Sequence, residues 1–387
     1  MDVSRFTKPH GRIIRTPQGY DAFVPDPLPH SFELSPGLQN LQSIADRRLG
    51  ELMGTARMLP NQQLLIAPLT HLESVLSSRI EGTQATVADL AIFEASGEAA
   101  FGPASDVKEV RNYRRALNHG LQRLSSLPLS LRFVRELHSE LLRDVLSEDK
   151  TPGEFRTSQV WIGPPGCLLT DATYVPPPPS ELMPCLADWE SLLHEGIDIP
   201  TLVKSALLHY QFEAIHPFVD GNGRVGRLLL IVFLLAGSYV STPILFVSPF
   251  FARHRDQYYD LLRGVTESSA WHPWIEFFLR AVAIQSRDAV IRAQRLLDLQ
   301  QNYRDHLSRA SRSSNRLMDL LFITPAVTVS AVAHQLDVTW PTANAAVSLL
   351  CEVGILDEVT GQRRDRLFLA RGIVDVINEE LGEEEID

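Results

Sequence analysis

The sequence predicts a mainly helical protein, and two observations carry this prediction. Apolar residues recur at helical spacing over most of the chain from about residue 41 onward. Runs of β-branched and aromatic residues are short and confined to two stretches, around residues 158–175 and 355–369. We therefore expect helices almost throughout, one short β-hairpin flap in the middle of the chain and a small wing near its end.

Length and composition fit a protein of two or three domains. The chain has 387 residues, of which 44% are hydrophobic and 21% charged. Its net charge of −11 disfavours bulk association with nucleic acid or an anionic membrane. The most apolar run, Leu228–Ala236, is far shorter than the roughly 18 residues that a membrane-spanning helix requires. The three cysteines show no CxxC spacing and the N-terminus resembles no signal peptide, so we expect a cytoplasmic protein without a membrane partner.

Residues 1–105 are expected to form an arm followed by helices. Residues 1–40 are rich in proline and glycine and predict an extended arm. Periodic apolar residues then predict helices over residues 40–58, 70–81 and 86–95. A loop of small residues at 97–105 marks the end of this region.

The central region, residues 106–303, is predicted to be helical around one flap. Two amphipathic helices precede a segment rich in proline and glycine, residues 152–179. There the runs SQVWI (158–162) and ATYV (172–175) predict a hairpin-like flap, which four consecutive prolines end. Helices are predicted again over residues 181–194, 201–215, 223–236, 255–266 and 274–303.

The C-terminal region is predicted to be a winged helix-turn-helix at residues 317–373. A polar, serine-rich segment at 304–316 indicates a linker or a frayed helix in front of it. The predicted elements are helix, short helix, turn, helix and two short strands, which is the winged-helix order. Residues 374–387 complete a helix and end in an acidic tail.

The most informative segment of the chain is HPFVDGNGRVGR, residues 216–227. A helix delivers His216 to its end, where Pro217 prevents simple continuation. Gly221 and Gly223 permit positive φ angles, so that successive backbone N–H groups can converge on one point. A new helix begins there and adds the positive end of its dipole. The backbone alone therefore predicts an anion site.

Charged side chains extend this prediction to a polyphosphate. Arg224 and Arg227, three residues apart, lie on one face of the first turn of the new helix. Asp220 is the only carboxylate of the loop and is the expected ligand of Mg²⁺. His216 is placed to accept a proton from an incoming hydroxyl. A structural turn with solvated arginines is the alternative, which so many anion-directed groups disfavour.

This motif resembles the signature of Fic-domain proteins, HPFx(D/E)GNGRxxR, at every specified position. The segments EVRNYRRAL (109–117), GEFRTSQVWIG (153–163) and YVPPPP (174–179), with the winged helix, resemble bacterial Fic proteins that carry an N-terminal inhibitory helix. The resemblance implies a Fic-type helical catalytic domain over residues 106–303, with its core at about 128–280. It also implies transfer of AMP from ATP to Ser, Thr or Tyr hydroxyls of target proteins and of the chain itself.

The resemblance implies a role for each position of the motif. His216 would deprotonate the target hydroxyl, which attacks the α-phosphate and expels pyrophosphate. Asp220 would hold Mg²⁺, while Arg224 pairs with the β-phosphate and Arg227 with the γ-phosphate. Phe218 would anchor the loop. The α- and β-phosphates would be cradled by Gly221, Asn222 and Gly223.

A second motif, LSSRIEGTQ at residues 76–84, predicts a brake on this activity. Ser77 and Glu81 lie four apart on one helix face, and Gly82 ends the helix. The spacing matches the Fic inhibitory motif (S/T)xxxE(G/N). If Glu81 pairs with Arg227, ATP loses a γ-phosphate partner and its α-phosphate is misoriented. The resemblance also allows Glu81 to orient water for removal of AMP; a solvated glutamate at a helix end is the alternative.

Two further predictions concern the substrates. The exposed edge of the flap would pair with an extended segment of the target protein, and the alternative is a purely structural hairpin. The flap residues expected there are Arg156, Ser158, Val160, Trp161 and Ile162. Adenine would lie beside Arg253, Tyr258 and Tyr259, where at most one of the two adjacent tyrosines is expected to face the ligand.

The winged helix raises a competing function, regulation through DNA binding. Its predicted recognition helix, residues 341–353, contains no Lys or Arg, and residues 313–371 contain five Arg against six Asp and Glu. DNA binding requires several basic phosphate contacts, so protein docking or homodimerisation is favoured. A gel shift at low salt distinguishes these functions. A Fic enzyme that uses another nucleotide is a further alternative.

Overall fold

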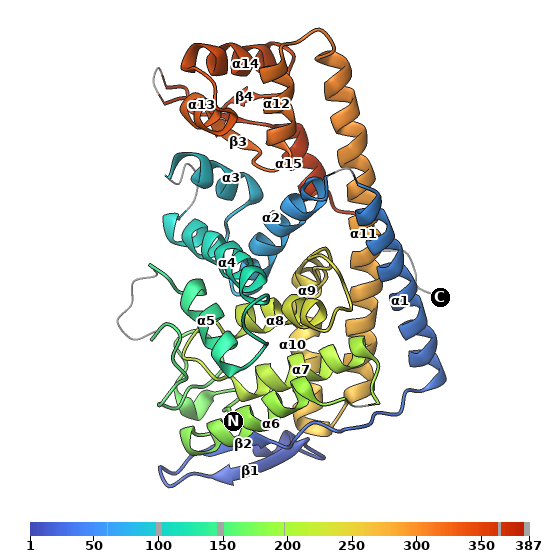
Figure 1. Cartoon of the computed structure of the whole chain (residues 1–387). Helices are drawn as coiled ribbons and strands as arrows, with labels where there is room; N and C mark the ends of the chain where they lie inside the picture. Colours follow the sequence, from blue (N-terminus) through green and yellow to red (C-terminus); the bar gives the residue numbers. More distant parts are fainter. Residues whose placement is uncertain (60, 98–102, 145–150, 197, 363–364, 383–387) are drawn as a thin grey trace.

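Helices make up most of the computed structural model, as the sequence predicts (Figure 1). The structure describes residues 1–59, 61–97, 103–144, 151–196, 198–362 and 365–382. None of the helices within these ranges is long and apolar enough to cross a membrane.

The N-terminal residues form a short sheet where the sequence predicted only an extended arm. After a 3-10 turn at Val3–Arg5, strand β1 (Gly11–Arg15) pairs antiparallel with β2 (Asp21–Pro25). Ala22, Phe23 and Val24 on β2 are buried. The prediction missed this hairpin because burial by distant segments, rather than an alternating pattern in the strands themselves, makes β2 a core strand.

The first part of the helical body contains α1 to α5, and their ends follow local capping rules. Ser35 caps α1 and is followed by Pro36 at the first helical position. Thr86 and Asp89 form a capping box at the start of α3, and Gly97 ends that helix at φ 78°. The bounds are α1 (Pro36–Met58), α2 (Gln63–Ile80), α3 (Val87–Ser96), α4 (Ala104–Arg123) and α5 (Leu131–Leu141).

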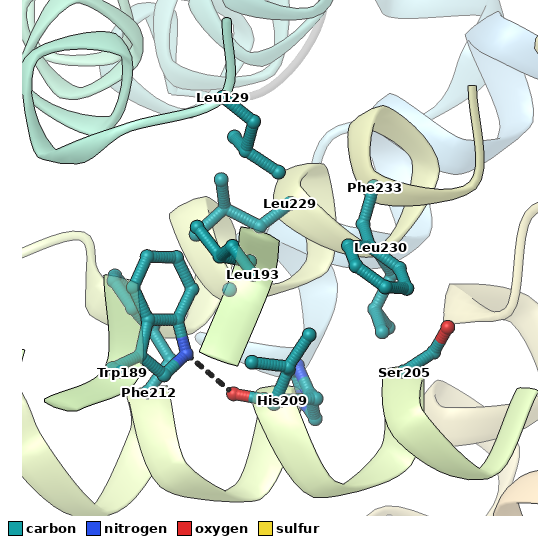
Figure 2. Close-up of a pocket in the computed structure, with 11 residues that line it drawn as sticks. Leu129, Trp189, Leu193, Ser205, His209, Phe212, Leu229, Leu230 and Phe233 are labelled. Atoms are coloured by element: carbon teal, nitrogen blue, oxygen red, sulfur yellow. Dashed lines mark hydrogen bonds between the residues drawn. The ribbon is translucent and has the colours of Figure 1, made fainter. Parts of the chain in front are cut away.

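The second part contains α6 to α11, built around two central helices. Helices α7 and α8 are buried on almost every side, and α1 runs alongside the long helix α11 (Figure 1). The bounds are α6 (Pro179–His194), α7 (Thr201–Ile215), α8 (Asn222–Ala236), α9 (Ser248–Arg253), α10 (Arg255–Ser268) and α11 (Trp271–His306). Figure 2 shows a small apolar pocket in this core, where Trp189 donates to the Leu208 carbonyl at 3.0 Å. Its volume of about 10 Å³ is too small for a ligand, so it is part of the packing.

The predicted flap contains a single β-bridge. Ile162 pairs antiparallel with Tyr174, and the Ile162 N–H donates to the Tyr174 carbonyl at 2.8 Å. Prolines on both sides of this bridge lack the N–H groups that would extend it into a regular ladder. A short 3-10 turn, Leu169–Asp171, lies between the two paired residues.

The C-terminal elements occur in the order predicted for a winged helix-turn-helix. A three-stranded antiparallel sheet of order β3-β5-β4 packs beside the helices. Its elements are α12 (Arg312–Leu321), β3 (Ala326–Thr328), α13 (Val329–Leu336), α14 (Trp340–Glu352), β4 (Asp357–Glu358), β5 (Leu367–Leu369) and α15 (Arg371–Asn378). The assignment to the winged-helix class stays a prediction.

Two details of the C-terminal region differ from expectation or lie outside the described residues. The segment 304–316 is largely helical, because α11 continues to His306 and Ser311 caps α12 one turn earlier than predicted. Two of the five arginines counted for this region, Arg363 and Arg364, and the acidic tail beyond residue 382 are outside the described ranges. The predicted domain boundaries stay predictions.

Helix α2 belongs to two hydrophobic clusters at once. Leu65, Leu69 and Ile80 pack with the central helices, whereas Leu72 and Val75 pack with α3 and the C-terminal unit. Helices α2 and α3 accordingly lie between the C-terminal unit and the rest of the body (Figure 1). The helix that leads to Glu81 is therefore packed on both sides, whereas Glu81 and Gly82 themselves are exposed.

Candidate active site

The loop after α7 begins with a histidine in an unusual backbone conformation. His216 ends α7 with φ 52° and ψ 62°, in the left-handed region that non-glycine residues rarely adopt. Gly221 then has φ 78° and caps the start of α8. The two residues bracket a tight loop between two buried helices, as the motif predicts.

Arg156 holds the start of this loop. Its Nε donates to the His216 carbonyl at 2.8 Å, and its Nη2 donates to the carbonyls of Pro177 at 2.6 Å and Ile215 at 3.3 Å. The guanidinium is buried and satisfies carbonyls that the end of α7 leaves unpaired. The expectation that Arg156 presents itself to a target protein is therefore wrong: this side chain fixes the backbone of the histidine.

His216 is uncharged in this environment. Burial, together with the charge of Arg156, lowers the pKa of His216 to about 4. Its Nδ1 is buried and has no hydrogen-bond partner among the described residues. At neutral pH the imidazole is therefore ready to accept a proton.

Asn222 closes the loop from within. Its Oδ1 accepts the Phe218 N–H at 2.8 Å, and its Nδ2 donates to the Phe218 carbonyl at 2.9 Å. The Phe218 side chain is fully buried, as expected of an anchor. Since the amide group of Asn222 is engaged in this way, only the backbone N–H of this residue is left for a phosphate.

Gly223 is required for space rather than for its backbone angle. It lies in the first turn of α8 and is not among the glycines with positive φ, so the expectation for its backbone is wrong. A Cβ atom at this position would lie 2.3 Å from Glu81 Oε1 and 2.9 Å from Arg227 Nη1. The absence of a side chain lets these two charged groups approach the helix.

The structure brings the predicted brake residues together. Arg227 donates from Nε to Ser77 Oγ at 2.8 Å, and from Nη2 to the Ser77 carbonyl at 2.9 Å and to Glu81 Oε1 at 2.7 Å. The arginine is 1% exposed and its two contacts with Ser77 are buried, whereas the Glu81 side chain is 32% exposed. Gly82 follows with φ 109°, which ends α2 directly behind Glu81.

Arg224 is engaged by two carboxylates. Its Nη1 donates to Glu109 Oε2 on α4 at 2.6 Å, and its Nη2 lies 3.6 Å from Asp220 Oδ1. The other arginine of the motif, Arg227, points toward α2 instead. No sequence pattern predicted Glu109 as a residue of the site.

His138 is another residue that the sequence did not reveal. The Gly153 N–H donates to its Nδ1 at 2.9 Å, so its Nε2 carries the proton and donates to the Asp220 carbonyl at 3.0 Å. Burial lowers the pKa of His138 to about 4, and its ring stacks on Phe218 at 3.7 Å between centroids. This neutral histidine supports the loop from behind.

A pocket of about 870 Å³ opens in front of the loop. This volume is in the range of small-molecule sites. Its wall includes the flap, the brake, the motif and the helix α10. The lining residues that matter here are Glu81, Trp161, Ile162, Glu213, His216, Gly223, Arg227, Arg255, Tyr258 and Tyr259.

Two of the three residues expected near adenine line the pocket, and the adenine site itself stays a prediction. Both Tyr258 and Tyr259 line the pocket, although Tyr258 is buried and its hydroxyl lies 2.8 Å from His209 Nε2. Arg253 does not belong to the pocket wall as described. Arg255 takes this place: its Nε donates to the Ile80 carbonyl at 2.7 Å, and its guanidinium lies over the Tyr259 ring. The helix break at His254 turns residues 253 and 255 in different directions.

The flap presents apolar side chains at the mouth of the pocket. Trp161 is 41% exposed and Ile162 is 40% exposed, and both line the pocket. Ser158 is exposed and Val160 half-buried. Four of the five predicted flap residues thus lie at or near the surface, whereas Arg156 does not.

Glu213 adds an unpredicted carboxyl group to the pocket. It lies one turn before His216, and its Oε1 is buried without a hydrogen-bond partner among the described residues. Burial raises the pKa of Glu213 to about 8. A glutamate within the apolar end of α7 was the only sequence signal that could have pointed to it.

We expect Glu213 to lower the free energy of unfolding as the pH rises from about 6.5 to 8. The unfolded carboxyl, with an ordinary pKa of 4.5, has lost its proton in this window, whereas folded Glu213 still binds one. Folding then requires proton uptake, which costs more as the pH rises, up to a limit of about 1.4 kcal/mol per pH unit for one group. Buried histidines with lowered pKa values oppose this trend near pH 6.5, because their imidazoles still bind protons there in the unfolded chain, at an ordinary pKa of 6.5.

Urea unfolding at pH 6.5, 7.25 and 8 measures the slope of the free energy of unfolding against pH. In Glu213→Gln, which cannot titrate, the decrease should be smaller than in the unmodified chain. Equal slopes for both proteins would show that Glu213 is ionised in the folded state.

Comparisons with known proteins place this fold in a known class. The overall fold is shared with a Fic family protein from Desulfovibrio desulfuricans, at a TM-score of 0.56 and 21% identity over 88% of this chain and 97% of that one. A Fic domain-containing signaling protein from Bacteroides thetaiotaomicron gives a TM-score of 0.53 and 19% identity, over 65% of this chain and 97% of that one. The helical body therefore has the Fic fold.

Sequence matches specify the family. Residues 39–122 match the Fic/DOC family N-terminal region, and residues 128–234 match the Fic/DOC family itself. The chain therefore contains a Fic N-terminal domain and a Fic domain. The protein adenylyltransferase Fic of Aedes aegypti is 32% identical over 151 residues, which are 38% of this chain and 27% of that protein. Its namesake in Drosophila grimshawi is 31% identical over 156 residues, 40% of this chain and 29% of that protein. The matched region thus spans less than a third of these relatives.

Proposed function

We propose that this protein transfers AMP from ATP to a hydroxyl group of a protein side chain. The observation that carries this proposal is the gathering of His216, Gly223 and Arg227 on the wall of one pocket. The relatives named protein adenylyltransferase support the same reaction.

The start of α8 is suited to hold a polyphosphate. Gly221 at the cap has no side chain to occupy the N–H groups of the first turn, and the helix dipole favours negative charge there. The bare backbone at Gly223 allows close approach. We propose that the α- and β-phosphates lie on this turn, with Arg224 beside the β-phosphate and Arg227 available for the γ-phosphate once Glu81 has left.

His216 would act as the general base. Its neutral imidazole takes the proton of the target hydroxyl, whose oxygen then forms a bond to the α-phosphorus. The bond from this phosphorus to the oxygen that bridges the α- and β-phosphates breaks, and pyrophosphate leaves. Arg156 keeps the imidazole in place through the His216 carbonyl.

The donor set of the loop fits Mg²⁺. The Asp220 carboxylate is partly exposed at the start of α8. No cluster of three or more His, Cys, Asp or Glu is present in the part of the chain that the structure describes. Mg²⁺ bound to nucleotide needs only one or two protein carboxylates, so Asp220 is sufficient to hold it. The ion would neutralise phosphate charge during transfer.

The structure also suggests how the reaction is restrained. The contacts of Arg227 with Ser77 and Glu81 occupy the guanidinium that would otherwise bind the γ-phosphate. We propose that the chain is autoinhibited in this arrangement, and that Glu81 is also the residue that could orient water for removal of AMP. The exposed Trp161 and Ile162 at the pocket mouth suit docking of a target segment.

Intact-mass measurement tests the proposed reaction. The full chain carrying Glu81→Gly is incubated in four separate reactions, each of which contains Mg²⁺ and one nucleotide: ATP, GTP, CTP or UTP. We expect a mass increase of one AMP group with ATP, and peptide mapping should place it on Ser, Thr or Tyr. If another nucleotide modified a greater fraction of the chain than ATP, the chain would be assigned to a different transferase reaction. If no nucleotide increased the mass, nucleotidyl transfer would be contradicted.

A further inference from the structure

Helix α4 presents a row of polar residues to the site. Asp106, Glu109 and Tyr113 are three and four residues apart and so lie on one face of the helix. Asp106 Oδ2 accepts the Gln84 N–H, just after the brake, at 2.8 Å, and Tyr113 donates to a buried carboxylate of α2 at 2.7 Å. The middle residue, Glu109, does not contact α2 in this way but pairs with Arg224 at the start of α8, next to the phosphate loop (residues 216–221).

Glu109 and Asp220 share one buried guanidinium. The Arg224 side chain is 4% exposed, and its closest contact is the 2.6 Å hydrogen bond from Nη1 to Glu109 Oε2. Asp220 lies farther away, with Oδ1 at 3.6 Å from Nη2. Arg224 Nε is buried and has no hydrogen-bond partner within the described ranges. A short, charge-assisted bond therefore draws the guanidinium toward α4.

Removal of Glu109 would change which carboxylate pairs with Arg224. Asp220 lies in the loop just before α8, and its Oδ1 is already within ion-pair distance of Arg224 Nη2, at 3.6 Å. With Glu109 gone, Asp220 is the carboxylate that still forms an ion pair with Arg224 among the described residues, so the guanidinium is expected to turn toward it. A full ion pair at this point would oppose binding of a cation to Asp220.

We propose that Glu109 is a positioning residue that draws Arg224 away from Asp220. In this role it keeps the charge of Asp220 directed to a divalent cation. The inference rests on the proposed function, since it assumes that a cation and a nucleotide bind at this loop.

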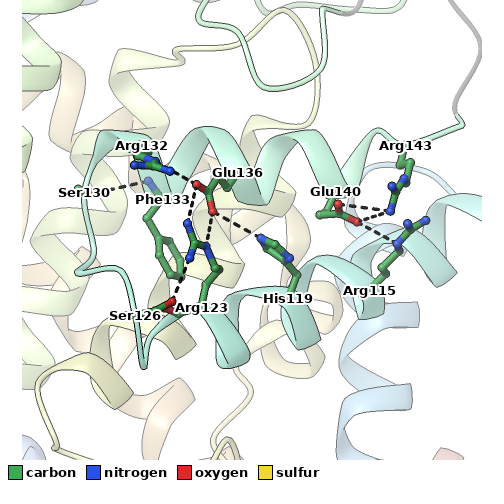
Figure 3. A network of polar contacts seen from close by, with 10 residues as sticks. All are labelled: Arg115, His119, Arg123, Ser126, Ser130, Arg132, Phe133, Glu136, Glu140 and Arg143. Carbon is green, nitrogen blue, oxygen red and sulfur yellow. Dashed lines mark hydrogen bonds and ion pairs between the residues drawn. The ribbon is translucent and has the colours of Figure 1, made fainter.

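Helix α5, which packs on α4, contains two glutamates that serve as controls. Figure 3 shows Glu136 and Glu140 of α5, which pair with arginines across the α4–α5 contact. Glu136 forms ion pairs with Arg123 at 2.7 Å and with Arg132 at 3.1 Å. Neither glutamate lines the pocket, so Glu136→Gln removes one carboxylate charge without touching the phosphate loop.

Calorimetric titration of the full chain tests this role. All variants carry His216→Ala to prevent transfer, and Mn²⁺ is the metal probe. We expect Glu109→Ala to weaken Mn²⁺ binding in the presence of ATP by about tenfold or more, as for other residues that orient metal ligands. Affinity for ATP in EDTA should not fall, because Arg224 remains. The Glu136→Gln variant should bind Mn²⁺ and ATP as tightly as the chain that carries His216→Ala alone.

The outcomes separate this inference from the proposed function. Unchanged Mn²⁺ affinity in Glu109→Ala would overturn the positioning role while leaving the proposed function intact, and so would a parallel loss of metal and ATP binding. A parent chain that binds neither ATP nor Mn²⁺ with ATP would overturn both. If the alanine variant does not fold, Glu109→Gln keeps the shape of the side chain, and a severalfold loss of Mn²⁺ affinity is then expected.

Discussion

Replacing Glu81 by glycine is expected to raise the rate of AMP transfer by about 100-fold. In the unmodified chain, Arg227 is held by Glu81 and by Ser77. Without the carboxylate, the guanidinium can bind the γ-phosphate and bring the α-phosphorus in line with the attacking hydroxyl. Misplacement of reacting groups by about 1 Å can cost on the order of 100-fold in rate, which sets the expected gain.

Label transferred from α-labelled ATP to the chain measures this rate. Glycine is tolerated at this position, because Glu81 caps the end of α2 rather than lying within it. A second measurement isolates the cause: the preference for ATP over ADP should increase in Glu81→Gly, since only ATP reaches Arg227 with a γ-phosphate. Glu136→Gln, which removes a remote glutamate, is the matched control. Equal transfer by Glu81→Gly and the unmodified chain would refute the brake.

The residues that sequence reasoning placed well are those whose surroundings are local. The loop after His216 is shaped by its own Pro217, Gly221 and Asn222, all within seven residues. The brake needed one long-range assumption, that Glu81 meets Arg227, and the motif spacing of both segments supported it. Short-range geometry of this kind can be argued from chain stereochemistry alone.

The residues that support the loop could not be derived in this way. His138, Arg156 and Glu109 reach the loop from positions between 60 and 115 residues away in sequence. No spacing rule says which helix lies behind which loop, so these side chains looked like ordinary members of amphipathic helices or of the flap. Gly223 shows the same limit, because its need for space depends on a carboxylate from α2.

The β1–β2 hairpin was missed for a related reason. Its strands are five residues each and carry no clean alternation, and β2 is buried by contact with distant segments such as the Val175 carbonyl, which accepts the Phe23 N–H at 2.9 Å. The helices, in contrast, have long periodic faces and their own caps. Local signals thus predicted the helical body, and tertiary contacts added the sheet.

Replacing His216 by alanine in the Glu81→Gly chain is expected to lower AMP transfer by about 1,000-fold. The imidazole is neutral at pH 7, because burial lowers the pKa of His216 to about 4, so it is in the proton-accepting form. A positioned general base typically contributes between about 100-fold and 10,000-fold. Its loss leaves the phosphate-binding groups in place but removes the group that takes the hydroxyl proton.

Initial transfer rates and nucleotide affinity together test this role. ATP binding should change little in the double variant, since under the proposed function the α8 turn and the two arginines, and not His216, would hold the phosphates. Arg156→Ala offers a graded comparison: it leaves the imidazole present but frees the His216 carbonyl from the guanidinium, so a smaller loss of rate is expected. A double variant that retains transfer within severalfold of Glu81→Gly would rule out His216 as the base and assign proton removal to another group of the pocket, of which Glu213 is the nearest along α7.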